Sequence, residues 1–254
     1  MSKKIDFNCD MGESFGIYKM GLDEEVIKNI SSANIACGFH AGDSLWMKRT
    51  VELAEQYNVA LGAHPSFPDL KGFGRRNMNI DPIEVKADII YQAGALSAFS
   101  TTKKIQHIKP HGAMYNQAVN DPDLAKAICE SILEFDDQVI LLALTGSQWV
   151  KIAKQMGLRV AREVFADRAI NSDGTLVSRT INGSVIHDTS EVIERSLKMV
   201  NDGVIESING DLVEVEADSI CLHGDTQGAV ELSKSLKEEF INSGISILPL
   251  GEIV

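Results

Sequence analysis

Residues 5–16 read IDFNCDMGESFG, an apolar run that gives way to acidic residues and glycine. Short apolar runs without polar alternation are typical of parallel strands that are covered on their outer face. The run therefore predicts a strand over residues 5–9. Asp10 and Glu13 follow the carboxyl end of that strand, which is the end at which α/β barrels carry their active sites.

The same pattern continues along the chain of 254 residues. Short apolar runs alternate with longer amphipathic stretches, which predicts a series of strand–helix units. Strands are expected over 5–9, 33–37, 60–63, 105–109, 139–144, 159–164, 219–222 and 245–248. Helices are expected over 23–30, 44–57, 82–98, 121–134, 147–156, 188–202 and 226–243.

This order of elements predicts the fold class. Seven or eight strand–helix units follow one another without a Pro- or Ser-rich linker, so we predict that residues 1–254 form one α/β domain. A single closed (β/α) barrel fits this order best, and a doubly wound open sheet is the alternative. Two stretches, 65–80 and 165–187, interrupt the order and predict long loops, the second with a hairpin-like excursion.

Several expected helices begin with a capping signal. Asp81 and Asp121 each precede a proline, which places a side-chain acceptor at the N-cap and a fixed φ at the first helical position. Ser147 and Asp188 are expected caps of the same kind. Asp43 precedes the helix expected over 44–57, so a capping role fits it better than a catalytic one.

Composition narrows the functional classes. The net charge of −12 argues against nucleic acid as a partner, since binding phosphates requires clustered Lys and Arg. The four cysteines have no CxxC spacing, which predicts buried free thiols rather than a disulfide or zinc framework. No apolar stretch approaches 18 residues, so no membrane span is expected, and a reducing cytoplasm fits these features.

Four of the six histidines follow expected strands: His40, His64, His111 and His223. One such histidine would usually be a packing residue, but a barrel brings the carboxyl ends of all its strands to one mouth. Four at equivalent positions, together with Asp10, therefore predict an active site there.

The same reasoning applies to other polar residues. Lys109 ends an expected strand and would be costly to bury unpaired, so it is expected to face a carboxylate or an anionic ligand. Glu163 is a candidate for that carboxylate. His107 and His187 lie outside the pattern and are expected to be structural. The motifs GxxxxGK[ST], GxSxG and HExxH are absent, which weakens the P-loop, serine-hydrolase and zincin interpretations.

A set of motifs resembles the LamB/YcsF family, whose members are described as one of the subunits of 5-oxoprolinase. The motifs extend over residues 6–225 and comprise DFNCDMGESFG, SANIACGFHAGD, GAHPSFPD with GFGRR, IKPHGAMYN, EVFADRA and CLHGD. The resemblance implies a seven-stranded barrel of the glycoside hydrolase/deacetylase type. It also implies a cytoplasmic enzyme that works with two partner subunits and consumes ATP to hydrolyse 5-oxo-L-proline to L-glutamate.

We assign roles on this basis. Asp10 is expected to be the general base, with His40 or His64 polarising water or orienting Asp10. Lys109 and His111 are expected to stabilise developing negative charge. The other expected substrate- or phosphate-binding residues are Asn8, Glu13, Arg75, Arg76, Glu163, Asp167, Arg168, His223 and Asp225.

Two alternatives remain open at this stage. The first is a stand-alone, deacetylase-like hydrolase in which Asp10, His40 and His64 hold a divalent metal such as Zn²⁺ or Mn²⁺. The second is a non-catalytic subunit that binds substrate for its partners. The sequence also leaves open whether ATP binds this chain, which carboxylate is the base, and whether the chain forms a homo-oligomer.

Overall fold

The barrel closes because its last ring strand pairs on both sides. The computed structural model of the chain describes residues 3–223 and 228–254. Strand β9 is bonded in parallel to both β6 and β1. The seven ring strands, in order, are β1 (Lys4–Met11), β2 (Ser32–Ala36), β3 (Ala60–His64), β4 (His107–Ile108), β5 (Ile140–Leu144), β6 (Val160–Phe165) and β9 (Ser219–Cys221). The predicted seven-stranded barrel is confirmed, and the alternative of an open sheet is wrong.

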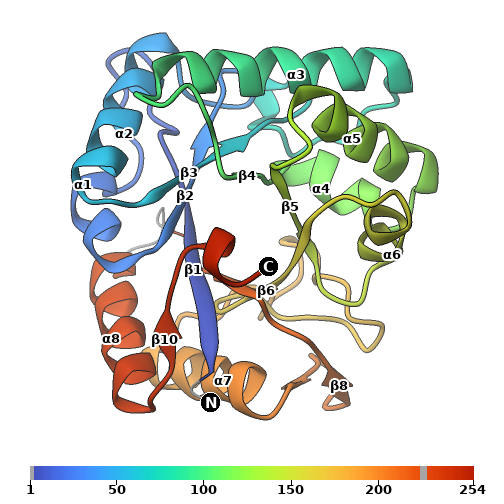
Figure 1. Cartoon of the computed structure of the whole chain (residues 1–254). Coiled ribbons are helices and arrows are strands. Elements are labelled where there is room, and N and C mark those ends of the chain that lie inside the picture. The colour runs from blue at the N-terminus through green and yellow to red at the C-terminus, as the bar shows by residue number, and fades with distance from the viewer. Residues whose placement is uncertain (1–2, 224–227) are drawn as a thin grey trace.

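Helices surround the ring of strands (Figure 1). They are α1 (Asp23–Val26), α2 (Ser44–Gln56), α3 (Pro82–Phe99), α4 (Gly112–Ala118), α5 (Pro122–Phe135), α6 (Gln148–Gln155), α7 (Thr189–Asn201) and α8 (Ala229–Asn242). Short 3-10 turns cover Ile27–Asn29, Leu70–Gly72 and Leu250–Glu252. Among residues 3–223 and 228–254, no helix is both long and apolar enough to cross a membrane.

The capping signals predicted the helix starts correctly. The side chains of Asp43, Asp81, Asp121, Ser147 and Asp188 each accept a hydrogen bond from a backbone N–H in the first turn of the helix that follows. Each cap satisfies a donor that the helix cannot satisfy internally. The first two residues of the helix predicted over 226–243 lie outside the described residues.

Several elements differ from the prediction, among them α4, which was not expected. The eighth expected strand is β10 (Ser246–Ile247), which pairs only with the first two residues of β1 and is not part of the ring. The strand expected over 105–109 is only two residues long, and Pro110, which follows it closely, has no N–H to donate to a sheet. The antiparallel hairpin of β7 (Val204–Glu206) and β8 (Leu212–Glu214) was not predicted.

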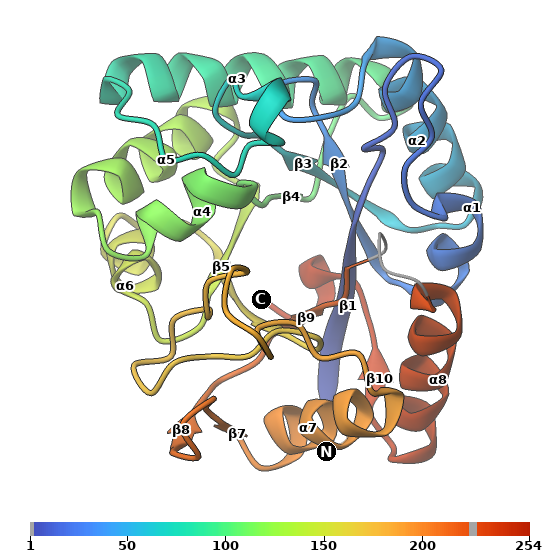
Figure 2. The same ribbon diagram turned by 180° about the vertical axis from the view of Figure 1, so that it is seen from behind.

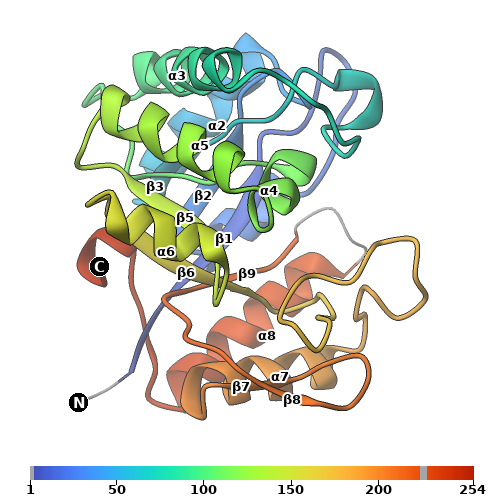
Figure 3. The same cartoon turned by 90° about the vertical axis from the view of Figure 1, so that its right-hand side faces the viewer.

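The loop over residues 165–187 lies at the carboxyl ends of the ring strands. Isolated antiparallel bridges join Arg168 to Val185 and Ile170 to Leu176, which confirms the hairpin-like excursion. Figure 2 shows this yellow-to-orange loop in front of the barrel, and Figure 3 shows it on the side opposite the N-terminus. The loop therefore covers the end at which the polar residues were expected.

The barrel interior below that end is polar. Asp6, Asn8 and Asn34 are buried there, and the hydroxyls of Ser32 and Ser219 donate to Asp6. Burial raises the pKa of Asp6 to about 6, although these hydroxyl donors favour its anion. This hydrogen-bonded interior connects the strands beneath the site.

His107 belongs to the same interior. Its Nε2 lies 2.7 Å from the side-chain oxygen of Asn34, and burial lowers the pKa of His107 to about 3. A neutral ring that donates from Nε2 fits both observations. His187, by contrast, is exposed just before α7.

Gly62 makes room for His107, and replacing it should destabilise the fold. A Cβ at position 62 would lie 2.0 Å from His107 Nε2. We expect Gly62→Ala to lower the free energy of unfolding by about 1–3 kcal/mol or more, because the buried ring cannot move aside freely. Thermal denaturation measures this loss. The control is Gly94→Ala in α3, where a Cβ has open space, and an equal fall in stability for both variants would contradict this explanation.

Candidate active site

A cavity of about 590 Å³ opens at the carboxyl ends of the ring strands, and we call it the mouth cavity. Its lining comes from residues at, or just after, the carboxyl ends of β1, β3, β4, β6 and β9, together with the loop over 165–187. The ionisable residues that line it are Asp10, Glu13, His64, Arg75, Lys109, His111, Tyr115, Arg168, Arg179 and His223. The structure thus brings together most of the residues singled out in the sequence.

Asp10 and Lys109 form the centre of the cavity wall. Lys109 Nζ lies 3.0 Å from Asp10 Oδ1, and His64 Nε2 lies 3.4 Å from Asp10 Oδ2. Asn34 also donates to Asp10 Oδ1 over 2.8 Å. Burial alone would favour the neutral acid, but the charges of His64 and Lys109 outweigh it and hold the pKa of Asp10 well below its ordinary value. Asp10 is therefore an anion at neutral pH.

Lys109 is a buried cation with several partners. Its Nζ lies 2.9 Å from Glu163 Oε1, 3.0 Å from Cys221 Sγ and 3.3 Å from Asn8 Oδ1. Burial by itself would lower the pKa of Lys109, but the carboxylates of Asp10 and Glu163 raise it well above its ordinary value. Lys109 faces a carboxylate, as predicted, and carries a fixed positive charge into the cavity.

The sequence did not indicate that Tyr115 contacts Glu163 or that Cys221 contacts Lys109. The hydroxyl of Tyr115, on α4, donates to Glu163 Oε2 over 2.8 Å and so orients the second carboxylate beside Lys109. All four cysteines are buried and free, which confirms the prediction of buried free thiols, but Cys221 also contacts Lys109. Burial raises the pKa of Cys221 well above its ordinary value, so this thiol is protonated.

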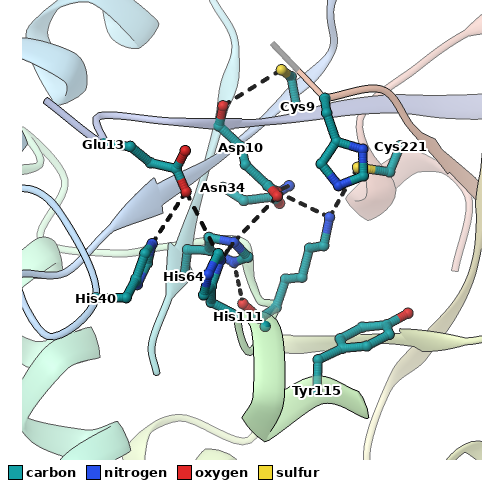
Figure 4. Close-up of polar contacts among 12 residues, drawn as sticks. Cys9, Asp10, Glu13, Asn34, His40, His64, His111, Tyr115 and Cys221 are labelled. Carbon is teal, nitrogen blue, oxygen red and sulfur yellow. Dashed lines mark hydrogen bonds and ion pairs between the residues drawn. The ribbon is translucent and has the colours of Figure 1, made fainter. Parts of the chain in front are cut away.

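Three histidines and Glu13 form a second group, which we call the Glu–His cluster (Figure 4). The rings of His40 and His111 are stacked with their centroids 3.7 Å apart, and His64 meets both edge-on. Glu13 Oε1 lies 3.2 Å from His40 Nε2. Burial lowers the pKa of His40 and of His111 well below the usual value, so both rings are neutral at pH 7.

His223 has a carboxylate partner. Its Nδ1 lies 3.0 Å from both carboxylate oxygens of Asp167. Burial alone would raise the pKa of Asp167, but the charges of His223 and Arg168 lower it instead. Asp167 therefore orients His223 at the cavity edge and does not line the cavity itself. The expected ligand Asp225 lies outside the described residues.

The two adjacent arginines expected to bind substrate have different surroundings. Arg75 lines the mouth cavity, with its guanidinium carbon 4.8 Å from the centre of the Phe73 ring. Arg76 does not line that cavity. Its Nε donates to Asp69 Oδ1 over 2.8 Å. Asp69 also accepts from the backbone N–H groups of Gly72 and Arg76, and so holds this turn and the Arg76 side chain together. This placement corrects the expectation that both arginines bind substrate.

Arg168 lines the cavity, and its side chain hydrogen-bonds to the loop over residues 165–187. Its guanidinium donates to the carbonyl oxygens of Val177 and Ser184, within the excursion predicted over 165–187. Burial and the neighbouring charge of Arg179 lower the pKa of Arg168 to about 10. Arg179 is an exposed lining residue that sequence reasoning missed. Positive charge thus gathers on the loop side of the cavity.

Comparison with known proteins agrees with this arrangement. The model of the LamB/YcsF family matches residues 5–254. The chain belongs to the LamB/YcsF family. One relative of this LamB/YcsF chain, a 5-oxoprolinase subunit from Pyrococcus furiosus, is 53% identical over 253 residues, which are 99% of each chain. The resemblance of the motifs is therefore confirmed.

Solved structures confirm the type of barrel. The LamB/YcsF chain is similar to the lactam utilization protein from Thermus thermophilus, with a TM-score of 0.90, 42% identity and coverage of 96% of this chain and 99% of that chain. It also shares its fold with the peptidoglycan deacetylase PdaC from Bacillus subtilis, with a TM-score of 0.52, 9% identity and coverage of 99% and 90%. The expected deacetylase-type barrel is thus confirmed for the fold.

Proposed function

We propose that this chain opens the lactam ring of 5-oxo-L-proline to give L-glutamate, within an ATP-consuming cytoplasmic hydrolase that includes two partner subunits. The observation that carries the proposal is the ion pair of Asp10 and Lys109 in the mouth cavity, in a chain whose relatives are named as 5-oxoprolinase subunits. A carboxylate and an ammonium at one reacting centre suit the hydrolysis of an amide.

The lactam needs activation before water can attack it. An unstrained cyclic amide is a poor electrophile, so we propose that the amide oxygen takes the γ-phosphoryl group of ATP and the ring nitrogen loses its proton. Water then adds to the resulting imidate carbon, and the C–N bond breaks as the ring nitrogen takes up a proton, which leaves the amino group of glutamate and an acyl phosphate on its side chain. A second water molecule hydrolyses this acyl phosphate to the side-chain carboxylate and free phosphate. The chain's task is to hold the ring, deprotonate water and stabilise charge.

The residues of the cavity fit these tasks. Asp10 is held as an anion and is the proposed general base, and the neighbouring histidines lie where they can polarise the attacking water. Lys109 supplies a fixed positive charge for the oxygen on which negative charge develops. Arg75 is the proposed partner of the substrate carboxylate, since a guanidinium fork matches a carboxylate.

Replacing Arg75 should weaken substrate binding. A charge-assisted hydrogen bond contributes about 1.5–3 kcal/mol, so we expect Arg75→Met to raise KM for 5-oxoproline about 10- to 100-fold. Arg76→Met is the matched control, since that guanidinium is bound to Asp69 outside the cavity. Steady-state kinetics of the assembled complex measure both. Equal KM values for the two variants would remove Arg75 from the carboxylate site.

Reconstitution tests the function as a whole. The tagged chain is purified with its co-purifying partners, each component is then separated, and release of glutamate and ADP is measured for every combination. We expect glutamate and ADP in equal amounts only when all components, 5-oxoproline and ATP are present. Glutamate formation without this chain, or none from the complete set, would overturn the proposal.

A further inference from the structure

Hydrogen-bond partners fix the ring tautomers in the Glu–His cluster. His64 Nδ1 lies 2.6 Å from the carbonyl oxygen of Lys109, and His111 Nε2 lies 2.9 Å from that of Phe73. A carbonyl oxygen only accepts, so each of these nitrogens carries the ring hydrogen. The opposite nitrogens, His64 Nε2 and His111 Nδ1, lie 2.9 Å apart. With the ring hydrogens on the other nitrogens, these two atoms face each other as lone pairs, and a cation between them, either a metal ion or an added proton, would bridge them.

His40 and Glu13 complete the donor set. Glu13 Oε1 lies 3.2 Å from His40 Nε2 and 3.9 Å from His111 Nδ1. His40 Nδ1 is buried and makes no hydrogen bond to any residue that the structure describes. Because the 3.2 Å spacing to Glu13 belongs to His40 Nε2, the unpartnered Nδ1 on the other side of the ring is not part of this donor set.

The spacing of the donors suits one metal ion. One donor atom from each of Glu13, His40, His64 and His111 lies within 4.8 Å of the others. Metal–nitrogen bonds of about 2.0–2.1 Å place adjacent ligands roughly 3 Å apart, close to the 2.9 and 3.2 Å found here. Three imidazoles and one carboxylate favour zinc or a similar transition metal over Mg²⁺ or Ca²⁺.

The surroundings support the same use. Metal-bound histidines usually donate their other ring N–H to a carbonyl or carboxylate, as His64 and His111 do here. The Phe73 ring stands nearly perpendicular to the rings of both His40 and His111, with centroids 5.5 and 5.4 Å away. Phe73 therefore covers part of the cluster, while Glu13, His64 and His111 line the mouth cavity.

A second group of potential metal ligands, Asp10, Cys221 and His223, already contacts the ammonium group of Lys109. Asp10, Cys221 and His223 also approach one another closely enough to hold a metal. Lys109 Nζ lies 3.0 Å from both Asp10 Oδ1 and Cys221 Sγ, so its ammonium group neutralises that set. The sequence-based metal set of Asp10, His40 and His64 is therefore revised, with Glu13 and His111 in place of Asp10.

We propose that Glu13, His40, His64 and His111 bind one divalent transition-metal ion of the zinc class beside the mouth cavity. Metal binding is inferred from the geometry of the four side chains. A role for the metal ion in lactam opening rests on the proposed function. There the ion would polarise a water molecule or a substrate oxygen next to Asp10. His64 links the two groups, since its Nε2 also lies 3.4 Å from Asp10.

Metal titration of the whole chain tests this proposal without substrate or partners. The chain is stripped with a chelator, dialysed, and titrated with Zn²⁺ by calorimetry and with Co²⁺ by its visible d–d absorption. We expect one equivalent of each metal, nitrogen-rich Co²⁺ bands, and a rise in Tm on addition of Zn²⁺. Failure of the wild-type chain to bind one equivalent would overturn the proposal.

Variants locate the bound ion. Glu13→Gln and His64→Gln are expected to weaken Zn²⁺ binding at least about 100-fold and to abolish the Tm rise. His187→Gln, an exposed histidine outside the cluster, should bind as the wild type does, and so should His223→Gln. Retained affinity in both cluster variants, or a loss confined to His223→Gln, would contradict the assigned ligands. Because glutamate release is not measured here, this result is independent of the proposed function.

Discussion

Asp10→Asn is expected to lower kcat for ATP-dependent glutamate release by about 10²- to 10⁴-fold, the usual loss on removal of a general base. The amide keeps the shape of the carboxylate and can still accept from Asn34, which now donates to Asp10 over 2.8 Å. It cannot take a proton from water, and it no longer provides the anion beside Lys109. Steady-state kinetics of the reconstituted complex measure the effect.

Asp43→Asn is the matched control for Asp10. Asp43 follows the neighbouring strand β2, but it caps α2 and does not line the mouth cavity. Because Asn is as good an N-cap as Asp, we expect near wild-type turnover for this variant. We expect a small loss of stability, because the amide keeps the capping bonds but loses the exposed hydrogen bond from Gly16 N–H to Asp43 Oδ2. Wild-type turnover in Asp10→Asn would exclude Asp10 as the base, whereas equal losses in both variants would indicate damage to the loop rather than to the chemistry.

Lys109→Met is expected to impair both stability and catalysis. The substitution removes a buried cation that lies 3.0 Å from Asp10 and 2.9 Å from Glu163. Removing one partner of a buried ion pair typically costs about 3–5 kcal/mol, because the remaining charge has no compensation. If the variant folds, we expect kcat to fall at least about 100-fold through loss of charge stabilisation. Thermal denaturation and the glutamate assay measure the two effects.

A double-mutant cycle separates charge compensation from packing. Glu163→Gln removes one of the two carboxylates that Lys109 neutralises, and Tyr115 still has an oxygen at that position to which it can donate. We therefore expect the double variant with Lys109→Met to be more stable than Lys109→Met alone. Additive losses of stability would contradict the view that Lys109 balances Glu163.

The sequence predicted the central residues well because strand topology fixes their position. Asp10, His64 and Lys109 each end or follow a parallel strand, and the carboxyl ends of such strands meet at one mouth. Their convergence, found here at 3.0–3.4 Å, needed only the order of the elements. The pairing of Lys109 with a carboxylate followed from the cost of burying an unpaired charge.

Other features depend on local geometry that no periodic pattern reveals. Arg75 and Arg76 are neighbours in sequence, but the turn built around Asp69 takes one guanidinium and leaves the other in the cavity wall. Tyr115 reaches Glu163 from α4, which starts at Gly112. The φ of Gly112 is +53°, and a Cβ at this position would lie 2.5 Å from the carbonyl oxygen of Gly74, so a glycine is needed there. This short helix gave no periodic signal of its own.

The contact of Cys221 with Lys109 was equally hidden. A cysteine in an apolar run is typical of a core strand, and nothing in residues 219–222 indicates the ammonium group that approaches from the end of β4. Such a contact between residues far apart in the sequence arises only when the ring closes through β9.

A crystal structure of the chain with 5-oxo-L-proline tests the central claim most directly. We predict that the lactam ring lies in the mouth cavity, with its amide carbon facing Asp10, its amide oxygen within hydrogen-bonding distance of Lys109, and its carboxylate on Arg75. A ring bound elsewhere on the chain, or in the cavity but turned away from both Asp10 and Lys109, would contradict the proposed chemistry.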